Sequence, residues 1–306
     1  MSSNLYQINL PINVAGFSKI TRGRIHETYE VRDVNNKKYF LKYTDDLVAD
    51  LRTERYAIME LRKKDIKSKI PKVVYYKFGI NKGYILYPYY PNNKIVWENN
   101  KYVANFTKNL ATFLKNLHSL SVSSKFNNWK ENSPVLSRWL DDFESNTRDM
   151  VLESQYSEYE DIIKDGCKWI KNQSKSINKS YTHGDIHLSN IIHKKDGSIK
   201  KVIDWERLKI SDPAYDVMKA EVLILDLYYS LTNYTREKLI KMFRDTYKMS
   251  PQFEERVDAY KPMYLLRTTV KTNKRVYEEW LDVGTQEKCI ETYEDIFEPV
   301  FSNSPY

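Results

Sequence analysis

The sequence is poor in the residues that characterise several kinds of protein. It has only 2 cysteines, Cys167 and Cys289, which lie far apart and lack the paired spacing of a zinc site or a disulfide framework. Its 8 glycines and 10 prolines in 306 residues exclude a fibrous or low-complexity chain. Its most apolar stretch, Val222 to Leu231, is interrupted by Asp226 and is too short to cross a bilayer.

The two ends show no targeting signal. Met1 to Phe17 do not form a basic region followed by an apolar core, and neither end carries a lipidation motif. We therefore expect a cytoplasmic protein without a membrane partner.

The residues that are abundant indicate a globular protein. Apolar residues make up 41% and aromatic residues 14%, with 25 tyrosines, which excludes general disorder. The length allows one large domain or two medium ones. The formal charge of +8, from 49 basic and 41 acidic residues, points to nucleic acid, an anionic membrane or a phosphorylated small molecule, unless it reflects only abundant lysine.

The first 90 residues have the pattern of a small sheet with one inserted helix. Ala49 to Lys63 reads as a helix, with Leu51, Tyr56 and Met59 at helical spacing. The predicted strands are β-branched and aromatic runs: Phe17–Thr21, Thr28–Asp33, Lys38–Tyr43, Val73–Phe78 and Gly83–Tyr87.

The chain becomes mainly helical after Pro91. An apolar stripe from Phe106 to Leu120 predicts a long helix reaching His118, and Ser250-Pro251 predicts a helix start. A short hairpin interrupts the helices, with runs at 190–193 and 201–203 joined by a turn at 195–197. The sequence thus predicts an α+β protein with a β-rich lobe at 1–90 and a helical lobe at 91–306.

The sharpest motif runs from His183 to Asn190 and reads His-Gly-Asp-Ile-His-Leu-Ser-Asn; Ile-Asp-Trp-Glu follows at 203–206. Asp185 and Asn190 have the spacing of a kinase catalytic loop, in which the Asp accepts a hydroxyl proton and the Asn holds magnesium. Asp204 would supply a second oxygen ligand, the donor type that magnesium prefers.

A second pair lies upstream in the order that the same chemistry requires. Lys42 ends the strand Tyr39-Phe40-Leu41-Lys42, and Glu54 lies on the following predicted helix. In kinases such a lysine binds the α- and β-phosphates, and the glutamate orients the lysine.

With these motifs the chain resembles the aminoglycoside phosphotransferase-like family of small-molecule kinases, over most of its length. Members read His-Gly-Asp, four residues, Asn, then Ile-Asp-Trp/Phe-Glu/Asp and Asp-Pro-x-x-Asp; the last occurs here at 212–216. The resemblance implies a protein-kinase-like bilobal fold that uses ATP or GTP and Mg²⁺. It also implies that Asp185 is the catalytic base, Asn190 and Asp204 are magnesium ligands, and His183 and Asp216 support the catalytic loop.

The resemblance also implies nucleotide-binding residues. Lys42 and Glu54 would position the triphosphate, and the hinge at about 87–91, with Tyr87 and Tyr89, would receive the purine through backbone groups. The phosphate loop departs from the protein-kinase pattern of three glycines, because Thr21 to Thr28 contain only Gly23. Gly23 is the one residue that we name there as a candidate.

The acceptor is expected to be a small molecule. A protein kinase needs a long activation segment after the metal-binding aspartate, whereas here only a short loop separates Asp204 from Asp212-Pro213. Residues 1–90 hold 17 basic and 9 acidic residues, whereas residues 91–306 hold 32 of each. Two segments of the second lobe are acidic: 141–165 has nine acids against two bases, and 276–306 has eight against one.

Acidic segments of this kind favour a cationic acceptor such as an aminoglycoside, an amino sugar or an amino alcohol, unless they are simply solvated helix faces. A choline- or ethanolamine-type kinase is the alternative, with Trp205, Tyr264, Tyr277 and Trp280 as aromatic groups for a quaternary ammonium.

Two rival functions belong to other classes. A catalytically inactive kinase-fold binding protein usually lacks the lysine, the base or a metal ligand, all of which are present here. A nucleic-acid binder is supported by the net charge alone, with no recognised motif, so no nucleic-acid partner is expected. The sequence leaves the oligomeric state open.

Overall fold

The structure is a computed structural model that describes residues 8, 10–20, 26–93, 95–123, 136–154, 156–173, 176–226 and 228–271. The chain divides into two compact units. The first unit consists of Met1–Asn93 and Lys200–Leu208, and the second of Lys94–Ile199 and Lys209–Tyr306. The sequence-based division at residue 90 keeps 200–208 in the helical lobe, whereas in the structure these residues pack with the first unit.

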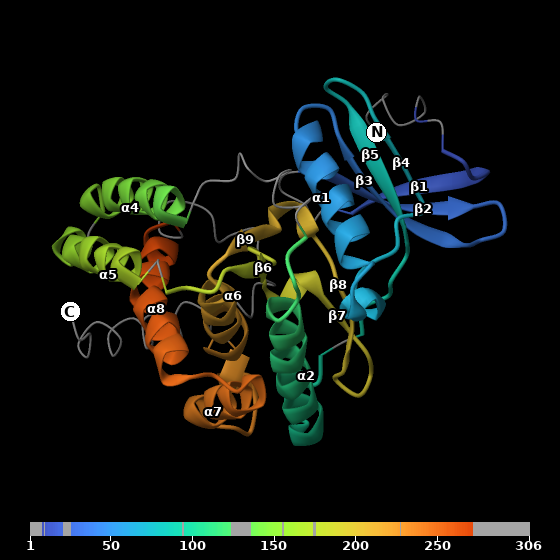
Figure 1. Ribbon diagram of the computed structural model, residues 1–306. Helices are drawn as coiled ribbons and strands as arrows, with labels where there is room; N and C mark the ends of the chain where they lie inside the picture. The colour runs from blue at the N-terminus through green and yellow to red at the C-terminus, as the bar shows by residue number, and fades with distance from the viewer. Residues whose placement is uncertain are drawn as a thin grey trace. The chain divides into compact units, whose positions relative to one another are not determined.

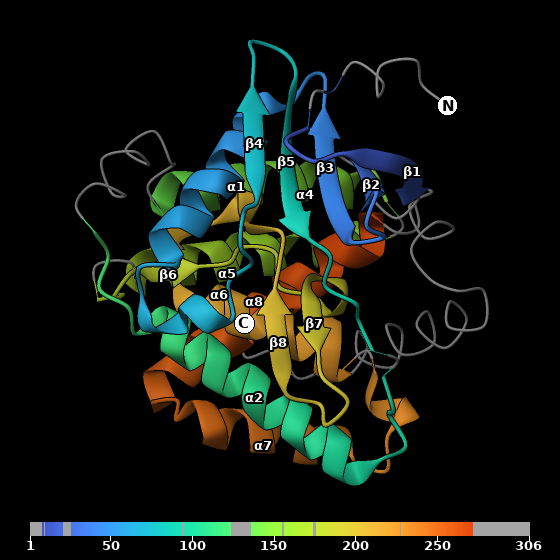
Figure 2. The ribbon, with the colours of Figure 1, turned by 90° about the vertical axis from the view of Figure 1, so that its right-hand side faces the viewer.

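A five-stranded antiparallel sheet forms the centre of the first unit, with the strand order β1-β2-β3-β5-β4 (Figures 1 and 2). The five predicted strands are all present, with their ends shifted by a few residues. They are β1 (Val14–Ile20), β2 (Glu27–Asp33), β3 (Lys38–Thr44), β4 (Tyr75–Phe78) and β5 (Gly83–Pro88).

One face of this sheet carries an aromatic and aliphatic core. Val31 of β2, Leu41 of β3 and Leu86 of β5 are completely buried in it together with several tyrosines. Because successive side chains of a strand point to opposite faces, the residue after Leu41, Lys42, faces away from this core.

Helix α1 (Val48–Leu61) packs on β5 and on the short 3-10 turn Trp205–Arg207 (Figure 1). Most of its buried residues recur every three or four positions, as a helix with one buried face requires: Val48, Leu51, Glu54, Ala57, Ile58 and Leu61. Glu60 is buried as well. Met59, which the sequence placed on the apolar face, is 44% exposed because Ile58 takes the buried position instead.

The second unit is mainly helical. Its helices are α2 (Asn100–His118), α4 (Leu136–Leu152), α5 (Glu160–Gln173), α6 (Pro213–Ala220), α7 (Arg236–Tyr247) and α8 (Pro251–Lys271). Strand β6 (Ser180–Thr182) pairs antiparallel with β9 (Lys209–Ser211). The predicted hairpin segments appear as β7 (Ile191–His193) and β8 (Ile199–Val202), and the chain passes from the second unit to the first within β8.

The predicted apolar stripe of α2 is buried, including Phe106, Leu110, Leu114 and Leu117. Helix α2 lies beside α7, and α8 packs on α5 and α6 (Figures 1 and 2). No helix in the described part of the chain combines the length and the apolar composition needed to cross a membrane.

Candidate active site

Lys42 lies near the end of β3, in register with Thr28 of β2 and Ile85 of β5. Its ammonium Nζ lies 2.9 Å from Glu54 Oε2 on α1. Both side chains are buried, with 9% of Lys42 and 4% of Glu54 exposed. The structure thus brings together the lysine and the glutamate that the sequence paired.

Two more carboxylates reach Lys42 from the segment that follows β8. Asp204 Oδ1 and Glu206 Oε2 each lie 2.7 Å from Lys42 Nζ. Asp204 has left-handed backbone angles, φ 67° and ψ 63°, which are uncommon for residues other than glycine. Between the two acids, the buried Trp205 donates a hydrogen bond from Nε1 to the Val202 carbonyl at 2.8 Å, which anchors this turn.

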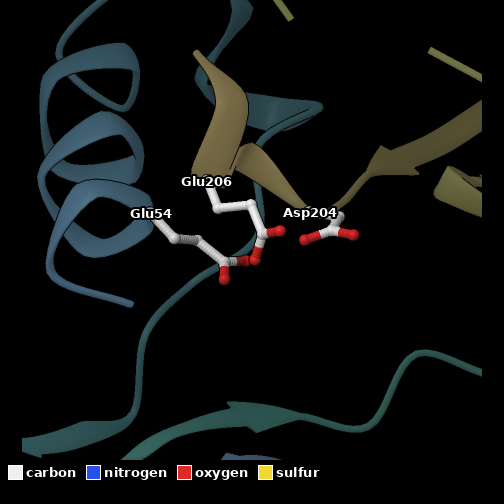
Figure 3. A group of neighbouring side chains, drawn as sticks. All are labelled: Glu54, Asp204 and Glu206. Carbon is white, nitrogen blue, oxygen red and sulfur yellow. The ribbon is translucent and has the colours of Figure 1, made fainter. Parts of the chain in front are cut away.

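The three carboxyl groups face one another, as Figure 3 shows. One oxygen atom from each of Glu54, Asp204 and Glu206 lies within 4.8 Å of the others. One oxygen of each acid binds the Lys42 ammonium in this structure. Carboxylate oxygens are also the donors that magnesium prefers, so Asp204 and Glu206, which are not needed for the Lys42–Glu54 pair, fit as magnesium ligands. The sequence predicted Asp204 as a ligand, and the structure adds Glu206 as a second carboxylate at the same place.

The charges of this cluster shift its protonation equilibria. Burial alone would lower the pKa of Lys42, but the charges of Glu54, Asp204 and Glu206 hold it above its usual value, so the side chain stays an ammonium. Burial raises the pKa of Glu54, and the neighbouring acids add to this effect while Lys42 opposes it. Although burial opposes the change, hydrogen bonding to His26 and the charge of Lys42 lower the pKa of Glu206 to about 2.

His26 and Glu206 are the residues of this cluster that sequence reasoning missed. His26 Nε2 lies 3.0 Å from Glu206 Oε2, and the imidazole side chain is 2% exposed. For Glu206 the available signal was its place two residues after Asp204 in the same motif. For His26 no pattern could indicate the contact, because the two residues are 180 positions apart.

The catalytic-loop motif lies in the second unit, between β6 and β7, and α6 holds its backbone. Asp216, which is completely buried, accepts hydrogen bonds from the His183 and Gly184 amides at 2.6 Å and 2.9 Å. His118 Nε2 lies 3.3 Å from the same carboxylate. Gly184 has a φ of 78°, a conformation that favours glycine over any residue with a side chain.

Asn190 closes the loop on itself. Its Nδ2 donates to the Asp185 carbonyl at 2.9 Å and also lies 2.9 Å from His187 Nε2. The Asp185 amide donates to His183 Nδ1 at 3.2 Å. These contacts fix the orientation of the Asn190 amide, whose oxygen is a donor of the kind that magnesium binds.

The carboxylate of Asp185 is 24% exposed and forms an ion pair with Lys219 of α6, whose Nζ lies 2.7 Å from Oδ1. Burial alone would raise the pKa of Asp185, but His187 and Lys219 hold it well below its usual range. Sequence reasoning missed Lys219. Its position one helical turn after Asp216 on α6 was the only signal within the sequence.

The remaining predicted residues are less directly placed. Tyr87 is buried near the end of β5, and its burial and the neighbouring Glu54 raise the pKa of its hydroxyl well above the usual value. The Tyr89 amide donates to the Lys38 carbonyl at 3.3 Å, so this hinge N–H is already paired within the first unit. Gly23 lies outside the described residues.

Several solved structures have the same fold. Aminoglycoside phosphotransferase APH(2'')-Ib with ADP bound is 16% identical, with a TM-score of 0.66 over 97% of this chain and 99% of that one. An ethanolamine kinase from Plasmodium vivax is 15% identical, with a TM-score of 0.61 over 93% and 84% of the two chains. The complex of APH(2'')-IIia with GDP and kanamycin is 12% identical, with a TM-score of 0.60 over 96% and 95%.

At such identities these likenesses show the fold, and they confirm the α+β, protein-kinase-like architecture expected from the motifs. No curated protein matches the chain by sequence. The model of the phosphotransferase enzyme family matches residues 16–256. This range includes the predicted base Asp185, the predicted magnesium ligands Asn190 and Asp204, and Lys42. The chain therefore belongs to the phosphotransferase enzyme family, and it is an enzyme that transfers phosphoryl groups to hydroxyl acceptors.

Proposed function

We propose that this phosphotransferase moves the γ-phosphoryl group of ATP or GTP to a hydroxyl of a small cationic molecule, such as an aminoglycoside, an amino sugar or an amino alcohol. The observation that carries the proposal is the buried contact of Lys42 with Glu54, Asp204 and Glu206. A buried lysine on a strand, held by a helix glutamate beside a metal-binding aspartate, is the arrangement that kinases use for a triphosphate. Similar structures contain ADP in one case and GDP in another, so both nucleotides remain candidates.

Lys42 acts on the nucleotide in this proposal. Its ammonium exchanges its contacts with Asp204 and Glu206 for oxygens of the α- and β-phosphates, while Glu54 stays in place as its fixed partner. Asp204, with Glu206 beside it, and Asn190 are the proposed magnesium ligands, and magnesium would neutralise charge on the phosphates. The hinge at Tyr87 and Tyr89 would hold the purine through its backbone.

Asp185 acts on the acceptor. The bond from the γ-phosphorus to the bridging oxygen of the β-phosphate breaks as the bond from the acceptor oxygen forms, and the hydroxyl proton passes to the Asp185 carboxylate. Because Lys219 and His187 hold the pKa of Asp185 low, the carboxylate is a weak base in the resting enzyme. It therefore orients the hydroxyl first and takes the proton only as the new bond forms.

The acidic segment at 141–165 supports a cationic acceptor, although part of its charge is neutralised within the second unit. Lys171 pairs with Asp141 and Glu144, both at 2.7 Å. Asp142 and Asp149 on α4 are exposed, and no basic partner for either is found among the described residues. These two acids, like the exposed Glu158 and Asp165 of the same segment, are candidates for contacts with a cation. The other acidic segment, 276–306, lies outside the described residues.

The choline- or ethanolamine-type alternative keeps support from the ethanolamine kinase of the same fold. The aromatic groups expected for it are only partly available. Trp205 is completely buried, so it cannot face a ligand, and Tyr277 and Trp280 lie outside the described residues. An inactive binding protein is the rival from another class, and it would be expected to lack turnover with every acceptor.

A screen for ADP or GDP release tests the proposal. The purified protein would be incubated with Mg²⁺ and either nucleotide, together with aminoglycosides, macrolides, amino alcohols, sugars and nucleosides, with Asp185→Asn as the control. We expect release with at least one amine-bearing alcohol and none from the variant. Release only with neutral acceptors would contradict the cationic substrate class, and no release with any compound would contradict the function.

A further inference from the structure

Helix α6 contacts the catalytic loop through two residues one helical turn apart. Asp216 binds the loop backbone at the His183 and Gly184 amides, as described above. Lys219 follows three positions later, and residues at i and i+3 lie on the same face of a helix. The two residues therefore bind adjacent parts of one loop: Asp216 its amides, and Lys219 the carboxylate of Asp185.

Lys219 is buried to an extent that is unusual for a lysine. Its side chain is 6% exposed, compared with 24% for its partner Asp185. Its Nζ donates to Asp185 Oδ1 at 2.7 Å and to the Gly184 carbonyl at 3.2 Å. The rings of Tyr215 and Tyr264 lie 6.0 Å and 5.8 Å from the same nitrogen.

Burying an ammonium group is unfavourable unless it is paired and hydrogen-bonded. The contacts of Lys219 that offset this cost include the side chain of Asp185 and the backbone next to it. A purely structural helix residue at this position would be apolar, as are the fully buried Val217, Met218 and Ala220 on the same helix. The charge of Lys219 is therefore directed at Asp185.

We propose that Lys219 is a positioning residue for the candidate base: its ammonium binds Asp185 Oδ1 and so fixes the orientation in which the carboxylate meets the acceptor hydroxyl. This role rests on the proposed function, since it requires Asp185 to act on a hydroxyl.

The proposal separates turnover from nucleotide binding. Misplacing a reacting group by about 1 Å can lower the rate about 100-fold, so we expect Lys219→Met to lower kcat by about 10- to 100-fold. The KM for the nucleotide should change less than about twofold, because Lys219 acts on the base and has no role in binding the nucleotide in this proposal. Lys219→Arg keeps the charge and a donor and should recover part of kcat.

The test compares kcat and both KM values of the wild type, Lys219→Met and Lys219→Arg, using the acceptor found in the release screen. Lys261→Met is the matched control, because Lys261 is also a buried lysine whose ion pairs among the described residues are with Glu221 and Asp258, outside the catalytic loop. It should lower the melting temperature and leave kcat unchanged. Lys219→Gln replaces Lys219→Met if circular dichroism shows that the latter does not fold.

The outcomes distinguish the two claims. A wild type without turnover overturns the proposed function and, with it, the role of Lys219. A wild type that turns over, together with an unchanged kcat in Lys219→Met or Lys219→Gln, overturns the role of Lys219 alone. If Lys219→Met loses nucleotide affinity as much as it loses kcat, Lys219 is merely structural and the positioning role is overturned. The same conclusion follows if a folded Lys219→Arg recovers none of the lost kcat.

Discussion

Lys42 Nζ and Glu54 Oε2 lie 2.9 Å apart inside the first unit, where neither side chain has a tenth of its surface exposed. Asp204 and Glu206 bind the same ammonium, so one lysine is the cation shared by three acids. Removing the lysine leaves three acids without that cation, whereas removing Lys42 together with Glu54 leaves two.

Loss of this lysine should destabilise the protein without nucleotide. We expect Lys42→Met to lower the free energy of unfolding by about 3–5 kcal/mol, because the acids then repel one another and two of them, Glu54 and Glu206, are buried. Urea denaturation measures this change. The double variant Lys42→Met/Glu54→Gln should recover part of the loss, and Lys19→Met, at an exposed pair with Glu27, should change little. Equal, small effects at Lys42 and Lys19 would contradict the buried cluster.

Nucleotide binding should depend on magnesium through Asp204. A ligand that binds only the folded state at about 100 times its Kd stabilises that state by about 2.7 kcal/mol, so ATP or GTP with Mg²⁺ should raise the melting temperature. Chelation with EDTA should remove most of the shift. Asp204→Asn should show the reduced shift even with Mg²⁺, whereas Asp46→Asn, at an exposed position after β3, should behave as the wild type. A full shift in Asp204→Asn would exclude it as a ligand.

The acceptor should be recognised through exposed acids of α4. Asp142→Asn and Asp149→Asn each remove one charge, and we expect a KM for a cationic acceptor about two- to fivefold higher, with kcat unchanged, which corresponds to a modest surface electrostatic interaction. Steady-state kinetics at low ionic strength measures this. Asp245→Asn on α7, whose partner is Lys241, is the control. If Asp142→Asn and Asp149→Asn match the wild type, as the control should, the acidic segment is only a solvated helix face.

Acid should destabilise the second unit through Glu221. This completely buried carboxylate accepts hydrogen bonds from Arg244 Nε at 2.8 Å and Nη2 at 3.0 Å. Burial opposes the change, but Lys261 and Arg244 lower the pKa of Glu221 in the folded state. Since the unfolded value is about 4.3, the stabilisation is present above that pH and is lost as the pH falls below it.

Glu221→Gln should therefore be less stable at neutral pH and lose less of its remaining stability on acidification. Melting temperatures between about pH 7 and about pH 3 measure both effects. Glu255→Gln, at an exposed position on α8, should retain the wild-type profile. If Glu221→Gln loses as much melting temperature on acidification as the wild type does, other carboxylates cause that loss.

The sequence could predict those parts of the fold and the site that depend on local pattern. The five strands, α1, α2 and the start of α8 follow from side-chain periodicity and from turn and cap residues. The contact between Lys42 and Glu54 was predicted from their order along the chain, because kinases pair a strand lysine with a glutamate of the following helix.

Contacts that depend on packing between distant segments were not predictable. His26 and Glu206 are 180 positions apart, and nothing local distinguishes His26 from an ordinary residue before a strand. Lys219 reads as one more lysine in a lysine-rich chain until α6 is placed against the catalytic loop. The exposure of Met59 shows the same limit of sequence-based prediction. A shift of the helix's buried face by one residue decides whether Ile58 or Met59 is buried, and in the structure it is Ile58.

The most direct test of the account is transfer of the labelled γ-phosphoryl group from ATP or GTP to an acceptor hydroxyl, measured for the wild type and Asp185→Asn. The Mg²⁺-nucleotide thermal shift of both proteins serves as the control for folding and binding. We expect the variant to keep the shift and to lose about 10²- to 10⁴-fold in kcat, the range typical of general base catalysis. An Asp185→Asn protein that binds nucleotide and transfers phosphate at the wild-type rate would contradict the assignment of Asp185 as the base.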